Sequence, residues 1–130
     1  MKTFILLLTV AITFMACDNN EDASNQDELL GKWKLIEIRS HGIVNTIDCK
    51  DAVLLDFKTD GLFEVEHFGS NDTNACISMG KIDEGSWVNV GNSLYNIDGD
   101  VVTPKFDGDL LIMVSNSGEE TESSGVFERQ

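Results

Sequence analysis

Short runs of alternating apolar and polar residues dominate the chain from Glu28 onward, and no long run has the 3.6-residue apolar period of a helix. The clearest case is AVLLDFK, residues 52–58, followed by TDG and then by LFEVEHF, residues 62–68. Apolar side chains alternate with polar ones on both sides of this turn, and the Asp-Gly pair suits a tight reversal. The pattern predicts a β-hairpin.

Turn residues separate further runs of the same kind. Gly-Asn at 91–92 and Asp-Gly at 107–108 predict two more hairpins. Pro104, the only proline, cannot donate a ladder hydrogen bond, so it marks an edge, a bulge or a break. Residues 69–84 are predicted to form a long loop. We predict about eight strands, at 32–41, 52–58, 62–68, 85–90, 93–98, 100–106, 109–115 and 124–130.

Sequential short strands with tight connections predict an all-β fold. An antiparallel up-and-down barrel of about eight strands accounts for them most simply, because closure removes exposed edges. A two-sheet sandwich is the alternative, and strand order in space separates the two. The interior set either packs as a core or lines a ligand pocket; it comprises Trp33, Leu35, Phe57, Phe63, Val65 and Trp87.

The first 17 residues differ sharply from the rest. Lys2 precedes an apolar run of about a dozen residues, too short for a comfortable membrane span of about 20 residues, which predicts a signal peptide. Its end, FMAC, resembles a bacterial lipobox, so Cys17 is expected to be acylated and to become the first mature residue. An ordinary secretory signal and a transmembrane anchor are the alternatives. Residues 18–28 then form a flexible acidic tether and residues 29–130 the folded domain.

The chain is strongly acidic, with 9 Lys and Arg against 23 Asp and Glu and a formal charge of −14. This charge excludes nucleic acid and anionic membrane surfaces as direct partners. Acidic residues soon after Cys17 resemble the surface-export signal of Bacteroidota lipoproteins, whereas Asp18 by itself resembles the inner-membrane retention signal of enterobacteria. The Asn- and Asp-rich composition favours the outer membrane and the cell surface.

Cys49 and Cys76 remain once Cys17 is assigned to the lipid. In an exported chain such a pair is most simply a disulfide, because the envelope outside the cytoplasm is oxidising. Metal binding or a catalytic thiol is the alternative, although neither cysteine lies in a Cys-x-x-Cys motif or beside a histidine.

Candidate catalytic chemistry is sparse. His67 shares a strand face with apolar residues and is a candidate for the barrel mouth, while His41 precedes a glycine in a turn. The Asp-Gly-Asp units at 98–100 and 107–109 suit hairpins as well as calcium, which also needs a distal ligand set. There is no Gly-x-Ser-x-Gly motif. We expect no enzymatic activity, no metal and no cofactor.

Several motifs occur in the order found in the short lipocalin-like domain of Bacteroidota lipoproteins, which the chain resembles over residues 29–114. The motifs are a Gly-x-Trp opening, a Phe-x-x-Asp-Gly hairpin, a second Gly-x-Trp and a cysteine pair around the hairpin. The resemblance implies an eight-stranded barrel with Trp33 packed across one end. The chain lacks a Thr-Asp-Tyr motif and a C-terminal helix pattern, which favours a shallow barrel. The matching residues are Gly31, Trp33, Cys49, Phe57, Asp60, Gly61, Cys76, Gly85 and Trp87.

These observations predict a monomeric, membrane-anchored envelope lipoprotein whose lipocalin-like barrel binds a small apolar ligand. The alternative is a protein-interaction or accessory module at the cell surface, with a packed barrel that has no cavity.

Overall fold

The computed structural model describes residues 26–115 and 123–130, which form β-strands and one short 3-10 helix. The predicted leader, Cys17 and the tether up to residue 25 lie outside the described residues. No helix in the described ranges has the length and apolar character needed to cross a membrane. The elements are β1 (Gly31–Ser40), β2 (Ile43–Thr46), η1 (Cys49–Asp51), β3 (Val53–Phe57), β4 (Leu62–Ser70), β5 (Cys76–Gly91), β6 (Leu94–Ile97), β7 (Asp100–Val102), β8 (Lys105–Asp107), β9 (Leu110–Ser115) and β10 (Ser123–Arg129).

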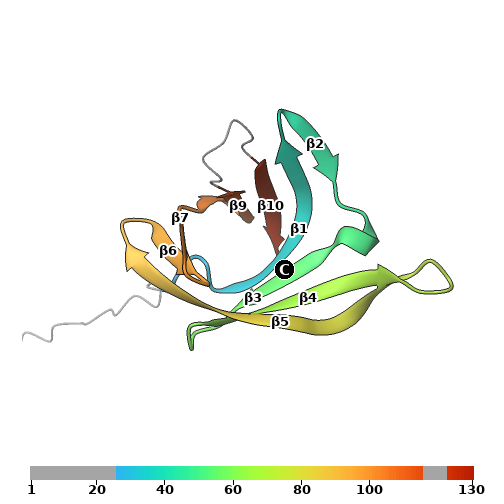
Figure 1. Ribbon diagram of the computed structural model, residues 1–130, viewed down its shortest axis with the longest axis horizontal. Coiled ribbons are helices and arrows are strands. Elements are labelled where there is room, and N and C mark those ends of the chain that lie inside the picture. The colour runs from blue at the N-terminus through green and yellow to red at the C-terminus, as the bar shows by residue number, and fades with distance from the viewer. Residues whose placement is uncertain (1–25, 116–122) are drawn as a thin grey trace, which may run out of the picture.

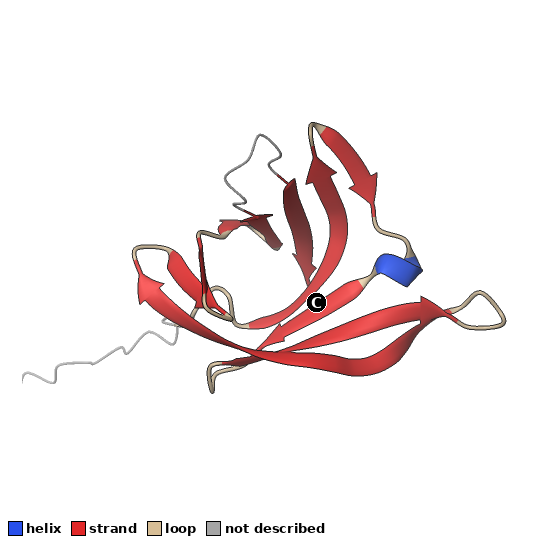
Figure 2. Cartoon of the chain, viewed as in Figure 1, coloured by secondary structure: helices blue, strands red, loops and turns tan. Residues whose placement is uncertain are grey.

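The strands form one strongly curved antiparallel sheet (Figure 1), an open half-barrel with no second sheet packed against it among the described residues (Figure 2). The strand order is β7-β6-β5-β4-β3-β1-β10-β9-β8, and β2 pairs with β1 beside this path. The edge strands β7 and β8 are consecutive in the chain, but β7 pairs with β6 and β8 with β9. The predicted all-β, antiparallel architecture is confirmed, and the sheet is open rather than a closed barrel.

All three predicted hairpins form. In the β3–β4 hairpin Phe57 lies opposite Phe63, so the alternating apolar side chains of both strands share one face. Gly61 in its turn has a φ of 79°, which glycine adopts without the steric cost that a Cβ brings. The β5–β6 hairpin turns at residues 91–93, and the β8–β9 hairpin turns at Gly108 with a φ of 58°. Local turn chemistry therefore sets these three connections.

Two of the predicted elements have different boundaries. The loop predicted over residues 69–84 is wrong, because β5 begins at Cys76 and pairs with β4 over residues 76–86. Register shifts in β4 around residues 65–68 accommodate the extra residues of β5. The run predicted as one strand over 100–106 is β7 and β8, separated at the buried Pro104, so of the predicted edge, bulge or break the structure has the break. β2 and η1 are additions that the sequence pattern does not predict.

Buried side chains gather at one end of the half-barrel, which we call the closed end. The strands β1, β4 and β9 begin there, and β3 and β10 end there. The rings of Phe57 and Phe63 have centroids 5.3 Å apart, and Trp87 meets Phe57 edge to face at 5.9 Å. Phe57 and Phe63 are directly paired on the neighbouring strands β3 and β4, and Trp87 lies on the next strand, β5, so the three rings pack together on the concave face. The buried cluster is Leu29, Trp33, Phe57, Phe63, Trp87, Tyr95 and Leu111.

Candidate functional site

The side chains of the predicted interior set differ in their exposure. Trp33 and Phe57 are 0% and 2% exposed, and Phe63 and Trp87 are 8% and 9% exposed. Leu35 and Val65, which lie further from the closed end, are only half-buried. The concave face therefore has a buried aromatic floor and a less covered part beyond it.

Cross-strand register identifies the residues of this less covered part. Directly paired residues project from the same side of a sheet. Trp33 pairs with Leu55, Leu55 pairs with Val65, and Leu35 pairs with Phe127. Met113 follows the buried Leu111 by two positions and so shares its face. These half-buried apolar residues, which we call the concave patch, are Leu35, Leu55, Val65, Met113 and Phe127.

Apolar residues continue the concave face towards the other end, which we call the open end. Ile38 pairs with Gly125, and Gly125 pairs on its other side with Met113. On the opposite wall Ile77 pairs with Gly69 in β4. A Cβ at Gly69 would lie 3.1 Å from the sulfur of Met79, which places Met79 on the same side. The exposed fractions at this rim are 39% for Ile38, 42% for Ile77 and 63% for Met79.

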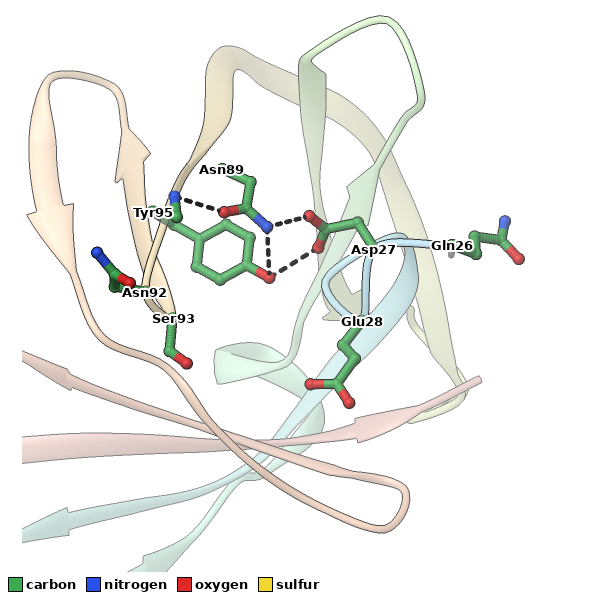
Figure 3. A pocket seen from close by; sticks show the side chains of 8 residues that line it. Gln26, Asp27, Glu28, Asn89, Asn92, Ser93 and Tyr95 are labelled. Carbon is green, nitrogen blue, oxygen red and sulfur yellow. Dashed lines mark hydrogen bonds between the residues drawn. The ribbon is translucent and has the colours of Figure 1, made fainter. Parts of the chain in front are cut away.

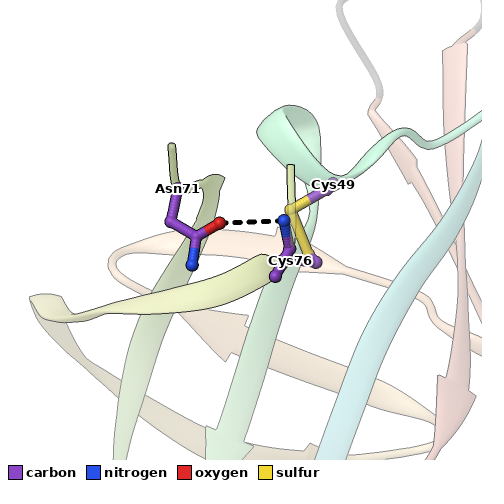
Figure 4. Close-up of a disulfide and its surroundings, with 4 residues drawn as sticks. Cys49, Asn71 and Cys76 are labelled. Carbon is purple, nitrogen blue, oxygen red and sulfur yellow. Dashed lines mark hydrogen bonds between the residues drawn. A yellow bond between two sulfur atoms is a disulfide. The ribbon is translucent and has the colours of Figure 1, made fainter. Parts of the chain in front are cut away.

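A disulfide joins Cys49 of η1 to Cys76 at the start of β5, at the open end (Figure 4). The two Cα atoms are 5.5 Å apart. In the turn before Cys76 the side-chain oxygen of Asn71 accepts hydrogen bonds from the backbone N–H groups of Thr73 and Ala75, at 3.0 and 2.9 Å. The predicted pairing is confirmed, and it fixes β5 to the segment that precedes β3.

The chain segment before β1 covers the closed end. The indole N–H of Trp33 donates a 2.8 Å hydrogen bond to the carbonyl oxygen of Leu29, whose side chain is fully buried. The guanidinium of Arg129 lies 4.1 Å from the centroid of the Trp33 ring and donates to the carbonyl oxygens of Leu30 and Glu28, at 2.9 and 2.8 Å. Trp33 of β1 and Arg129 of the paired strand β10 therefore both attach this segment to the sheet.

A second attachment, which we call the clasp, consists of Asp27, Asn89 and Tyr95 (Figure 3). The Tyr95 hydroxyl donates to Oδ1 of Asp27 at 2.8 Å, and the Asn89 amide donates to Oδ2 at 2.6 Å. The backbone N–H of Leu29 also donates to Oδ1, at 2.9 Å. Burial raises the pKa of Tyr95 well above its ordinary value, and the hydrogen bond to Asp27 and the charges of Asp27 and Glu28 raise it further. The hydroxyl thus remains a proton donor at neutral pH.

Two open polar pockets lie beside the clasp. One has a volume of about 390 Å³ and is lined by the clasp together with Gln26, Glu28, Asn92 and Ser93. The other, about 410 Å³, lies between the same N-terminal segment and Arg129. Among their polar side chains, those of Asp27, Asn89, Tyr95 and Arg129 are already hydrogen-bonded to the backbone or to one another. They hold the segment in place and offer no activated nucleophile.

The histidines are not part of a catalytic arrangement in the described region. His67 lies on the concave face opposite Val53, and it has no hydrogen bond to a hydroxyl or carboxylate among the described side chains. His41 lies in the turn between β1 and β2, with a φ of 51°. No group of three or more His, Cys, Asp or Glu side chains among the described residues is placed to hold a metal ion. Asp98, in the first Asp-Gly-Asp unit, accepts a 2.8 Å hydrogen bond from the backbone N–H of Ser86.

Sequence reasoning missed the clasp and the Arg129 attachment, because both join segments far apart in the chain. The hydrogen bonds to Asp27 from Asn89 and Tyr95 span 62 and 68 residues, and those from Arg129 span 99 and 101. In the sequence, nothing distinguishes Asp27 from the other acidic residues of the predicted tether. The chain matches no protein-family model, and no curated protein sequence matches it.

Proposed function

We propose that the protein is a membrane-anchored lipoprotein of the bacterial envelope whose half-barrel binds a small apolar ligand on its concave face. The observation that carries this proposal is the concave patch. Its five apolar side chains face inward from β1, β3, β4, β9 and β10, and they remain half-buried above a fully packed aromatic floor. A soluble protein gains stability by covering such side chains, so their partial exposure on a concave surface favours a ligand that covers them.

The size of the patch bounds the affinity. A ligand that removes about 200 Å² of apolar surface from water gains about 5 kcal/mol, at about 25 cal/mol per Å². Part of that gain is offset by the lost freedom of the ligand. The account therefore predicts dissociation constants of about 0.2 mM or weaker for simple apolar compounds.

The strand order supports the up-and-down connectivity of a lipocalin-like fold as the finer form of this open sheet. If β7 and β8 are counted as one strand interrupted at Pro104, the order runs β1-β3-β4-β5-β6-β7/β8-β9-β10 and returns to β1 through the β1–β10 pairing. This is the up-and-down connectivity of eight strands. The ordered Gly-x-Trp motifs and the cysteine pair support the same family, the short lipocalin-like domain of Bacteroidota lipoproteins.

The anchor follows from the lipobox at Cys17, with the outer membrane and the cell surface as the proposed location. Gln26, the first described residue, lies beside the clasp at the closed end. The tether therefore joins the domain at its closed end, while the open end and its apolar rim lie at the other end of the strands.

A protein-interaction module is the second candidate, and one observation favours it. On the convex face Val88 pairs with Asn96, which pairs in turn with Val101, and Val90 follows on β5. The exposed fractions of the three valines are 54%, 52% and 60% for Val88, Val90 and Val101. Exposed valines on neighbouring strands suit contact with a partner protein.

A fluorescence titration distinguishes the two candidates. The leaderless chain Asp18–Gln130 contains every described contact, and the neutral dye N-phenyl-1-naphthylamine brightens on entering apolar surroundings. We expect saturable binding that Met113→Gln weakens at least threefold, because the substitution places an amide on the concave patch. Val88→Gln, the matched change on the convex face, should leave the titration unchanged. Equal effects of the two substitutions, or no binding, would contradict the proposal.

A further inference from the structure

The concave and convex faces of the half-barrel differ in charge. Lys32 and Lys34 flank the inward Trp33, and so project from the convex face, where Lys32 lies 3.9 Å from Asp56. Arg39 follows the inward Ile38, and Lys105 precedes the inward Phe106, so both also project outward. Lys32 and Arg39 form ion pairs there with Asp56 and Glu37.

Arg129 shares the concave face with Trp33, its partner in the β1–β10 register. Its guanidinium is held at the closed end by two backbone carbonyl oxygens and the Trp33 ring. Among the strand residues whose side chains are described, no other lysine or arginine projects from the concave face. Among the side chains that the structure describes, the concave patch therefore has no cation free to receive an anionic group.

Carboxylates do project there: Asp100 of β7 lies opposite the inward Ile97, and Asp83 lies opposite a residue of the concave patch. Asp83 in β5 pairs directly with Val65 of the concave patch, and its side chain is exposed. The neighbouring pairs Glu64 with Glu84 and Phe63 with Gly85 fix the alternation, so that Asp83 lies on the same side as Phe63. The protein as a whole adds a formal charge of −14. An amphiphile with its tail on the concave patch brings its head group near the Asp83 carboxylate.

We propose that the concave face selects amphiphiles with a cationic head group over those with an anionic one, a specificity that rests on the proposed function. Asp83 attracts a positively charged head group and repels a negatively charged one. No described cation near the concave patch offsets the negative charge of Asp83. A head-group charge about 6 Å from the Asp83 carboxylate in a water-like dielectric is attracted or repelled by about 0.7 kcal/mol. The affinities of a cationic and an anionic amphiphile therefore differ by about 1.4 kcal/mol, or about tenfold.

Three 12-carbon compounds with different head groups test the proposal. Dodecyltrimethylammonium and dodecanoate, each below its micelle concentration, and dodecanol below its solubility limit compete at pH 8 with N-phenyl-1-naphthylamine for the leaderless chain. We expect the cation to bind most tightly, dodecanol to be intermediate and dodecanoate to be weakest, with about tenfold between the two charged compounds. Added salt should narrow the difference.

Two variants separate Asp83 from the overall charge. Asp83→Asn and Asp107→Asn change the net charge equally, but Asp107 follows the inward Phe106 and projects from the convex face. Asp83→Asn should reduce the cation preference to less than threefold, and Asp107→Asn should retain it. Near-ultraviolet circular dichroism serves as the control that both variants are folded.

The outcomes separate this inference from the proposed function. If dodecanol competes but the two charged compounds bind equally, or if the two variants behave alike, the assignment to Asp83 is overturned while apolar binding stands. If neither the dye nor dodecanol binds, the proposed function is overturned, and this inference with it.

Discussion

The Cys49–Cys76 disulfide should supply a large part of the stability of this domain. The bond closes a loop with a sequence separation of 27 residues. In the chain-entropy account, a cross-link of this span lowers the entropy of the unfolded chain enough to stabilise the fold by about 3.6 kcal/mol. The stability of a small domain is about 5–15 kcal/mol in total, so loss of the bond removes a substantial fraction.

Because the two cysteine side chains are little buried, replacing them isolates the effect of the disulfide on stability. Cys76 is exposed and Cys49 only half-buried, so replacing both with alanine removes little packing. The double variant Cys49→Ala/Cys76→Ala should therefore report the cross-link itself. At a urea m-value of about 1.5 kcal/mol per M, its unfolding midpoint should fall by about 2.4 M.

Urea unfolding of the leaderless chain, followed by tryptophan fluorescence, measures this difference. Reductant should lower the stability of the wild type to that of the double variant and leave the double variant unchanged. The β3–β4 hairpin lies wholly inside the closed loop, and any of its structure that persists in the unfolded chain reduces the effect. A difference below about 1 kcal/mol between oxidised wild type and double variant would refute the entropic reasoning.

Three further predictions concern the closed end and the anchor. Tyr95→Phe removes a hydroxyl whose folded-state pKa is raised, so the stability that this group contributes is complete below its unfolded pKa of about 10 and is lost as the pH rises towards the folded value. The stability gap between wild type and Tyr95→Phe should therefore shrink by about 1.4 kcal/mol between pH 8 and pH 11 in urea titrations, and a constant gap would contradict the raised pKa. Arg129→Ala removes two hydrogen bonds to backbone carbonyls and the contact with Trp33, and should lower the free energy of unfolding by about 2 kcal/mol. Arg129→Lys should not restore this stability, because a single ammonium group cannot donate to both carbonyls in the planar geometry of a guanidinium. Cys17→Ser should abolish labelling by a fatty-acid analogue in the exporting host, and persistent labelling would exclude the lipobox.

The part of the fold that the sequence predicts is the part set by local residues. The β3–β4 hairpin follows from apolar residues at every second position around an Asp-Gly turn, and the break at Pro104 follows from the missing N–H. The first half of β5 was hidden by the polar tract before it, SNDTNA over residues 70–75, which by composition is a loop. Its pairing with β4 is a tertiary interaction that overrides local propensity.

In the candidate site, too, the sequence predicts what local residues determine and misses what depends on tertiary structure. Alternation predicts which side chains share a face, and so identifies Leu35 and Val65 beside the buried aromatic residues. It does not predict how completely each is covered, because coverage depends on the curvature of the sheet and on the segment that closes one end. The role of Asp83 also depends on a register shift between β4 and β5 that no local pattern encodes.

Methyl-resolved NMR of the leaderless chain during a titration with dodecanol tests the central claim most directly. The account predicts concentration-dependent shifts confined to the concave side, with Leu35, Val65 and Met113 moving together and saturating along one binding curve. The convex methyl groups of Val88 and Val101 should stay in place. Shifts centred on those two valines, or no shifts at all up to the solubility of dodecanol, would contradict an apolar binding site inside the half-barrel.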